Sequence, residues 1–227
     1  MTQSSNISRR RKSALQEGNA EYVAKRAELV SVAAQLFKDN GYQSTTLADI
    51  GKIVGLDRAT MYYYVGSKEE LFRECIKDGV ASNISMCEKI AGDANLTPPE
   101  RLRKVFEQLM QAYEDNYPHM FVYIQEQMHQ VTHQSNPWAQ EILRQTRRFE
   151  KITIDLIKQS IDQGFFRKDV SPTLAANALF GMFNWTHRWH RPNGAVKAAD
   201  ISKAFCDIFF AGMDRRPARG RASSASR

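Results

Sequence analysis

The feature that most constrains the fold is a repeated helix start signal. A capping side chain stands directly before a proline three times, at Thr97-Pro98, Asn136-Pro137 and Ser171-Pro172. The cap accepts from the free amides of a first helical turn, and proline is tolerated there because it lacks an amide hydrogen. No stretch alternates between apolar and polar residues for the length of a strand. The pattern predicts an all-α chain with helices near residues 97–115, 118–133, 137–163, 172–190 and 197–212.

Shorter helices are predicted before residue 92. An apolar stripe runs from Val23 to Phe37 and ends at Asn40-Gly41. Thr46-Leu-Ala-Asp49 has the form of a capping box, and Gly55 ends that helix. Asp57 can cap a short helix through Tyr64, and Ser67-Lys-Glu-Glu70 opens a long one. About nine helices are expected in all: a three-helix helix-turn-helix domain at 21–66 and a helical effector-binding and dimerisation domain at 67–213, joined by a connecting helix at 67–92.

The net charge of +7 is concentrated at the two ends of the chain. Residues 1–20 carry four basic side chains against one acidic, and residues 214–227 carry five against one, whereas residues 21–213 carry 23 of each. Basic segments of this kind contact nucleic acid phosphates or act as solubilising tails. We expect a flexible basic arm at 1–20 and a disordered basic tail at 214–227. Arg9, Arg10, Arg11 and Lys12 have the reach to enter a DNA minor groove next to the helix-turn-helix domain.

Composition excludes several other classes of protein. No apolar run approaches the length of a membrane span, so we expect a soluble cytoplasmic protein. The three cysteines, Cys75, Cys87 and Cys206, contain no CxxC pair and are expected to be small buried side chains. No phosphate-binding loop or nucleophile motif indicates an enzyme, and no cofactor is indicated.

Residues 47–64 have the size and spacing of a helix-turn-helix. Two helices of about eight residues flank the turn Val54-Gly55-Leu56-Asp57, and the second helix of such a pair lies in the major groove. Met61 is predicted to point inward. Tyr62, Tyr63 and Tyr64 point about 100° apart on a helix, so they cannot all be core. The alternative is an ordinary helical hairpin with structural tyrosines.

The stretch from Ala33 to Phe72 resembles the DNA-binding domain of the TetR/AcrR family of transcriptional regulators. The motifs that carry the resemblance are Asn40-Gly41-Tyr42, Thr45-Thr46-Leu47-Ala48-Asp49-Ile50, Thr60-Met61-Tyr62-Tyr63-Tyr64 and Ser67-Lys68-Glu69-Glu70-Leu71-Phe72. Tyr64 stands where the family often has histidine, and Val65 where it often has phenylalanine. The resemblance implies that Arg58 and Ala59 read base edges and that Tyr62 contacts a base or its methyl group. It implies phosphate contacts from Thr45, Thr46, Thr60, Tyr63, Tyr64 and Lys68.

Large apolar side chains are frequent after residue 97 and could line an effector pocket between helices. The predicted lining residues are Phe106, Met110, Tyr113, Phe121 and Met128. The simpler alternative for each is ordinary core packing. The resemblance implies such a pocket, with a homodimer that binds a palindromic double-stranded operator as a repressor. We expect dimerisation through residues 172–190 and 197–212, on the apolar side chains of Leu174, Ala178, Met182, Trp185, Trp189, Ile201, Phe205, Ile208 and Phe209.

The segment 181–194 resembles regulators of fatty-acid and sterol-ring breakdown that respond to acyl-coenzyme A thioesters. Trp185 and Trp189 lie one helical turn apart, with Arg188 and Arg191 on the adjoining face. Such a surface could hold an acyl chain or adenine beside a phosphate. Alternatively, the tryptophans pack a dimer interface and the arginines are solvated.

Two further functions stay open at this point. Glu126, His129 and His133 share one helix face and could bind a metal ion, although a solvated polar face is the simpler explanation because the sequence names no fourth ligand. A metal-responsive or drug-responsive regulator of the same fold is therefore an alternative. An architectural DNA-binding protein would also be basic and helical, but it would not need an apolar-rich sensing domain.

Overall fold

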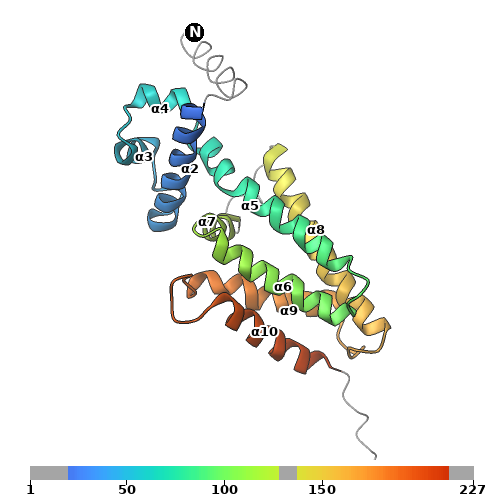
Figure 1. Cartoon of the computed structure of the whole chain (residues 1–227). Coiled ribbons are helices and arrows are strands. Elements are labelled where there is room, and N and C mark those ends of the chain that lie inside the picture. The colour runs from blue at the N-terminus through green and yellow to red at the C-terminus, as the bar shows by residue number, and fades with distance from the viewer. Residues whose placement is uncertain (1–19, 128–136, 215–227) are drawn as a thin grey trace, which may run out of the picture. The chain divides into compact units, whose positions relative to one another are not determined.

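The computed structural model describes residues 20–127 and 137–214, and these residues form nine α-helices, one 3₁₀ turn and no strand (Figure 1). The all-α prediction is confirmed. The helices are α2 (Ala20–Asn40), α3 (Leu47–Val54), α4 (Arg58–Tyr64), α5 (Lys68–Ala91), α6 (Pro98–Asp115), α7 (His119–Gln127), α8 (Pro137–Asp162), α9 (Pro172–Trp185) and α10 (Ala198–Met213), with the 3₁₀ turn η2 at Thr186–Arg188. None of the described helices is long and apolar enough to cross a membrane.

The described helices belong to two compact units. The first unit holds the described residues of 1–83 and 112–145, and the second holds those of 84–111 and 146–227. The boundaries lie inside α5, α6 and α8, so each of these helices contributes to both units. The functional division expected at residue 66 remains a prediction.

Side-chain caps fix the short helices at the start of the chain. The Thr46 side chain accepts from the Asp49 amide while Asp49 accepts from the Thr46 amide, which completes the capping box before α3. Gly55 ends α3 in the left-handed region at φ 73°, which favours glycine. Asp57 caps α4 by accepting from the Thr60 amide at 2.7 Å. These local predictions are confirmed.

The buried face of α2 differs from the predicted stripe. Val23 is 51% exposed and Ala27 is also exposed, whereas Tyr22, Arg26 and Leu29 are buried. Counting only apolar positions placed the buried face one residue too late in the first half of α2, about 100° around the helix, whereas Ala34 and Phe37 are buried as predicted. The true row contains a buried arginine because acidic partners on α5 satisfy its charge.

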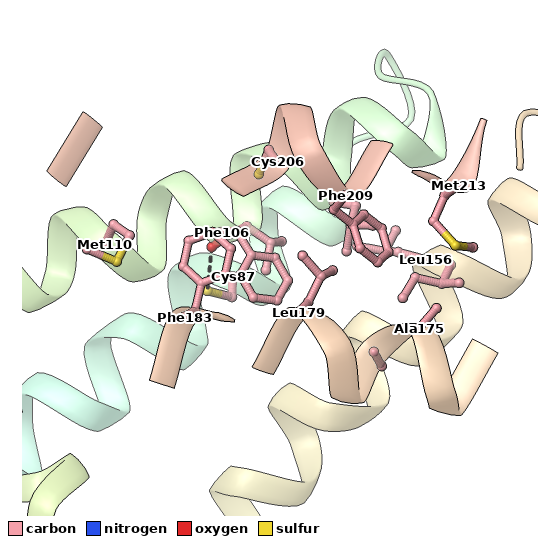
Figure 2. Close-up of a cluster of buried hydrophobic side chains, with 14 of the residues drawn as sticks. Cys87, Phe106, Met110, Leu156, Ala175, Leu179, Phe183, Cys206, Phe209 and Met213 are labelled. Carbon is pink, nitrogen blue, oxygen red and sulfur yellow. Dashed lines mark hydrogen bonds between the residues drawn. The ribbon is translucent and has the colours of Figure 1, made fainter. Parts of the chain in front are cut away.

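A continuous apolar cluster forms the core of the second unit (Figure 2). Phe106 lies at its centre, with ring centroids 4.6 Å from Phe183 and 5.9 Å from Phe149. Cys87 and Cys206 are buried in the same cluster, and Cys75 is buried in the first unit. All three cysteines are free thiols, as predicted. Burial raises the pKa of each to about 12, so they stay protonated at neutral pH.

The predicted helix at 172–190 ends earlier than expected. Regular helix stops at Trp185, and residues 186–188 continue as a 3₁₀ turn. The Thr186 hydroxyl donates to the Phe183 carbonyl at 2.6 Å, and the amides of Trp189 and His190 both donate to the Thr186 carbonyl. Such side-chain bonding to the backbone competes with the regular helical pattern.

Candidate nucleic-acid interface

Helix α4 presents its reading residues outward while one residue anchors it inside. Met61 is buried, as predicted. Arg58 and Ala59 are exposed at the start of the helix, and Tyr62 is 37% exposed one turn later. The Arg58 guanidinium lies 5.9 Å from the centroid of the Tyr62 ring. The three residues predicted to read bases are therefore all accessible.

A hollow of about 520 Å³ opens between α3 and α4 beside these residues. Its lining includes Thr46, Ala48, Lys52, Arg58 and Tyr62. Sequence reasoning missed Lys52, which is exposed in the last turn of α3. Its position in a capped eight-residue helix was the signal that could have found it. Lys52 and Arg58, the two exposed cations of this hollow, make it suitable for the anionic DNA backbone as well as for base edges.

Tyr63 and Tyr64 are half-buried against α2 instead of lying beside Tyr62 on the open face. The Tyr22 ring stacks on Tyr64 with centroids 5.0 Å apart and meets the edge of Tyr63 at 5.4 Å. The Tyr22 hydroxyl lies 3.4 and 3.2 Å from the carbonyl oxygens of Tyr63 and Tyr64, to which it donates. The two rings thus hold the end of α4 in place.

An ion-pair network around Arg26 fixes the same end of α4. The Arg26 guanidinium donates to the Tyr64 carbonyl, to Glu70 at 2.9 Å and to Glu74. Glu70 also accepts from the Gly66 amide at 3.0 Å, which ties down the residues after α4. Burial disfavours the charged form, but bonding to Glu74 and Glu70 outweighs it and raises the Arg26 pKa above its ordinary value.

Three of the side chains expected to contact phosphates form hydrogen bonds within the protein. Thr45 is 1% exposed, and its hydroxyl donates to the carbonyls of Gly41 at 2.9 Å and Leu36 at 3.3 Å. The Thr46 hydroxyl donates to the Asp49 carboxylate at 2.7 Å. The Lys68 ammonium donates to three backbone carbonyls. Because Thr45 is almost completely buried, its side chain is not placed to contact a phosphate, and it holds the turn before α3 instead.

The expected effector-lining residues are divided between the units. Phe106 and Met110 are buried in the apolar cluster of the second unit (Figure 2). Tyr113 and Phe121 are buried in the first unit, with ring centroids 6.0 and 6.1 Å from that of Tyr117. Met128 lies outside the described residues. All four described residues are buried, and their part in an effector pocket remains a prediction.

The tryptophans and arginines after Phe183 lie at the surface of the second unit. Trp185 is 56% exposed, and the Arg188 guanidinium lies 4.5 Å from the centroid of its ring. Trp189 is 47% exposed. Arg191 donates from Nη1 to the carbonyls of His187 at 3.2 Å and His190 at 2.9 Å, so its guanidinium is partly committed to the backbone.

The exposed apolar face of α9 and α10 overlaps the predicted dimer face only in part. Leu174 is 64% exposed and Ile208 is 65% exposed, and Ala178 is exposed between Leu174 and Trp185 along α9. Ile201 and Phe209 are buried in the unit's own cluster. Ile201 and Ile208 lie seven residues apart on the same side of α10, so this side is buried near the start of the helix and exposed near its end.

Several predicted residues cannot be placed. Arg9, Arg10 and Arg11 lie outside the described residues, as do His129 and His133, and the side chain of Glu126 is not described either. Among the side chains that are described, no group of three or more His, Cys, Asp or Glu residues could hold a metal ion.

Two family models match the chain. Residues 29–75 match "Bacterial regulatory proteins, tetR family", and residues 95–213 match "Tetracyclin repressor-like, C-terminal domain". The first of these ranges contains the whole hollow between α3 and α4. The second spans more than half of the chain.

Known regulators are similar to this chain over most of its length. The HTH-type transcriptional repressor KstR2 of Mycobacterium tuberculosis is 25% identical over 192 residues, covering 85% of this chain and 94% of that protein. A solved structure of the same ketosteroid transcriptional regulator matches with a TM-score of 0.77 and 25% identity over 84% of this chain and 95% of that one. The structure of AibR with isovaleryl coenzyme A and operator DNA shares the fold, with a TM-score of 0.69 and 21% identity over 82% of this chain and 98% of that one.

Proposed function

The chain belongs to the tetR family of bacterial regulatory proteins and is a DNA-binding transcriptional regulator, and on this premise we propose that it is a homodimeric repressor released from its operator by a hydrophobic effector. The observation that carries the proposal is the joint exposure of Arg58, Ala59 and Tyr62 on a short helix held at both ends. Its known relatives are regulators, and the chain is not an enzyme.

Arg58 is the proposed base reader. Its guanidinium can donate two parallel bonds to guanine O6 and N7, the commonest specific contact in a major groove. Tyr62 lies beside it and offers a ring for a thymine methyl group, and Ala59 leaves room for a close approach. Lys52 and Thr60 are the proposed phosphate partners on the same face. Tyr63 and Tyr64 are expected to contribute less to DNA binding, because their rings pack against α2 and support the helix.

A palindromic operator follows from a two-fold dimer. The exposed row of Leu174, Ala178 and Trp185 on α9, together with Ile208 on α10, supports a dimer through these two helices. Ile208→Asp should convert the protein to a monomer by light scattering at micromolar concentration, since it buries a charge in the interface. Lys203→Asp, at an exposed position of the same helix, is the matched control and should remain dimeric. A dimer that survives Ile208→Asp unchanged would place the interface elsewhere.

The proposed effector is an acyl-coenzyme A of lipid or sterol breakdown. Two similar proteins support this proposal. KstR2 is a ketosteroid transcriptional regulator, and the structure of AibR shows that this fold can bind a coenzyme A thioester and operator DNA. The exposed pair Trp185 and Arg188 provides a cation beside an aromatic ring, which suits a phosphate next to an adenine. The same surface supports the dimer proposal, so the two roles compete for it.

The direct experiment is binding to the DNA upstream of the protein's own gene, with and without a panel of acyl-coenzyme A thioesters. A defined footprint that one thioester abolishes is the expected result. Uniform coating of any DNA would favour an architectural protein, and release by a divalent metal or a drug would favour the corresponding alternative effector. A cytoplasmic location and a DNA-binding role for residues 9–12 remain parts of this proposal.

A further inference from the structure

We propose that Lys68 is a positioning residue, which holds the turn between α2 and α3 in the shape needed for DNA binding and does not donate to a phosphate itself. The inference deepens the proposed DNA-binding face and rests on it. It concerns the residues 41–46 that connect the two helices, and the first residue of α5.

The contacts of the Lys68 ammonium account for all its donors. Nζ lies 2.8 Å from the Tyr42 carbonyl oxygen, 3.2 Å from that of Gln43 and 2.8 Å from that of Thr45. An ammonium has three N–H groups and no others, so each hydrogen has one carbonyl partner. A bond to a phosphate would require it to give up one of these carbonyls.

The Lys68 ammonium also contacts the Tyr42 ring. Nζ lies 4.4 Å from the ring centroid, within the range of a cation–π contact. The ring itself is buried and packs 4.8 Å from Phe72 and 5.2 Å from Phe37 between centroids. The charge is therefore seated on a rigid aromatic base, whereas a lysine that contacts a phosphate usually extends into solvent.

Two side chains bond to the carbonyls of the turn. Gly41 adopts a left-handed conformation at φ 82°, and the carbonyls that follow point inward toward the start of α5. The Thr45 hydroxyl bonds to the Gly41 carbonyl, and Lys68 receives those of Tyr42, Gln43 and Thr45. Unpaired carbonyls in this part-buried turn would be costly. Together the two side chains replace backbone bonding across the turn.

The turn leads directly into the DNA-facing surface. Thr46, which follows it, caps α3, and Lys68 and Thr46 both line the hollow beside Arg58. We call the three bonds from the Lys68 ammonium to the turn carbonyls the lock. Loss of this lock would let the first turn of α3 move relative to α4. Lys68 therefore acts on DNA through the turn.

The sharpest test is Lys68→Arg, with Lys77→Arg, at an exposed position of the same helix, as the matched control. Arginine keeps the charge and binds phosphate well, but its planar fork of donors cannot take the place of a compact ammonium among three carbonyls. We expect Lys68→Arg to weaken operator binding at least tenfold and to speed amide exchange of residues 42–49 at least tenfold in the free protein. Lys77→Arg should change affinity less than twofold. A Lys68→Arg variant that keeps full affinity and normal amide exchange would show a phosphate contact and overturn the proposal.

A second measurement needs no variant. In nuclear magnetic resonance spectra of the free dimer near pH 6, the Lys68 ammonium should give a resolved signal with slowed proton exchange, whereas that of Lys52 should not. The Lys68 signal should keep its shift when operator is added. Its absence in the free protein, or a large shift on DNA, would contradict the lock. If the protein bound no DNA at all, the proposed function would fail while the signal and amide exchange would still decide the lock.

Discussion

The DNA-binding helices and the core of the second unit are stabilised by different kinds of contact. Helices α3 and α4 have eight and seven residues, and polar side chains hold their ends: Thr46, Asp57, Arg26, Tyr22 and Lys68. The second unit relies on a buried apolar cluster centred on Phe106. Helices this short are unstable alone, and a polar bond has a directional geometry that an apolar contact lacks. The comparison teaches that orientation of the reading face and bulk stability are supplied by separate sets of residues.

The largest effect should come from the apolar cluster. Phe106 is fully buried among Phe149, Phe180 and Phe183, so Phe106→Ala removes packing and leaves a cavity. We expect a loss of about 3–5 kcal/mol in the free energy of unfolding, measured by urea denaturation. Leu174→Ala, on the exposed face of α9, is the control and should change monomer stability by less than about 0.5 kcal/mol.

Thiol labelling can show whether that damage stays in the second unit. With pKa values near 12, all three buried thiols should resist alkylation at pH 8 in the native protein. In Phe106→Ala, Cys87 should react faster because it lies in the same cluster, while Cys75 should keep its native rate. Equal acceleration at both sites would mean that the two regions open together, and the comparison would fail.

Breaking the polar support of α4 should cost less. Arg26→Met leaves Glu70, Glu74 and the Tyr64 carbonyl without their shared donor. The carboxylates are partly exposed at 29% and 33%, so we expect about 2–3 kcal/mol of stability to be lost, below the cost for a fully buried pair. Operator affinity should fall as well. Lys25→Met, which removes an exposed pair with Glu28 on the same helix, should cost less than about 0.5 kcal/mol.

The sequence predicted best where a signal and its structural result lie within a few residues. The Thr46–Asp49 capping box, the Asp57 cap and the inward Met61 all depend on neighbours three or four positions away. The supports of the reading face were missed because they join distant segments. Lys68 bonds to a carbonyl 23 residues earlier, and Arg26 bonds to Glu74, 48 residues later. No periodicity predicts such pairs, and a buried arginine disrupts the apolar count on α2.

The second unit shows the complementary limit. Its helices and its apolar composition were predictable, but the partition of apolar residues between core and surface was not. Ile201 and Ile208 lie on the same side of α10, yet Ile201 is buried and Ile208 is exposed, because the neighbours that cover each turn of the helix come from distant parts of the chain. For the same reason Phe106 and Met110, expected to line a pocket, lie in the packed cluster.

Arg58 should separate specificity from stability. Arg58→Ala is expected to reduce discrimination at one base pair by about 1–3 kcal/mol, as for an arginine that reads guanine. Unfolding free energy should change by less than about 0.5 kcal/mol, since the side chain is exposed. Lys52→Ala should instead weaken operator and random DNA alike. Equal loss for both kinds of DNA in Arg58→Ala would show that Arg58 is a phosphate contact.

The smallest effect concerns the charge of the cap on α4. The Thr60 amide donates to the Asp57 carboxylate and holds the pKa of Asp57 below its ordinary value. A carboxyl whose pKa is lower in the folded state stabilises the fold above its unfolded pKa near 3.9, and this contribution is lost as the pH falls through the lower folded value. Asp57→Asn keeps a good capping oxygen but removes the titration.

The melting temperature of Asp57→Asn should therefore fall less steeply than that of the natural protein between pH 5 and pH 3. The two should differ little at pH 6, apart from the loss of a favourable charge at the helix N-terminus. Because the cap lies in the polar-supported region, the same acid range should weaken operator binding before it disturbs the apolar cluster. If the melting temperatures of the two proteins changed in parallel with pH, the charge of Asp57 would add nothing to its hydrogen bond as the cap of α4.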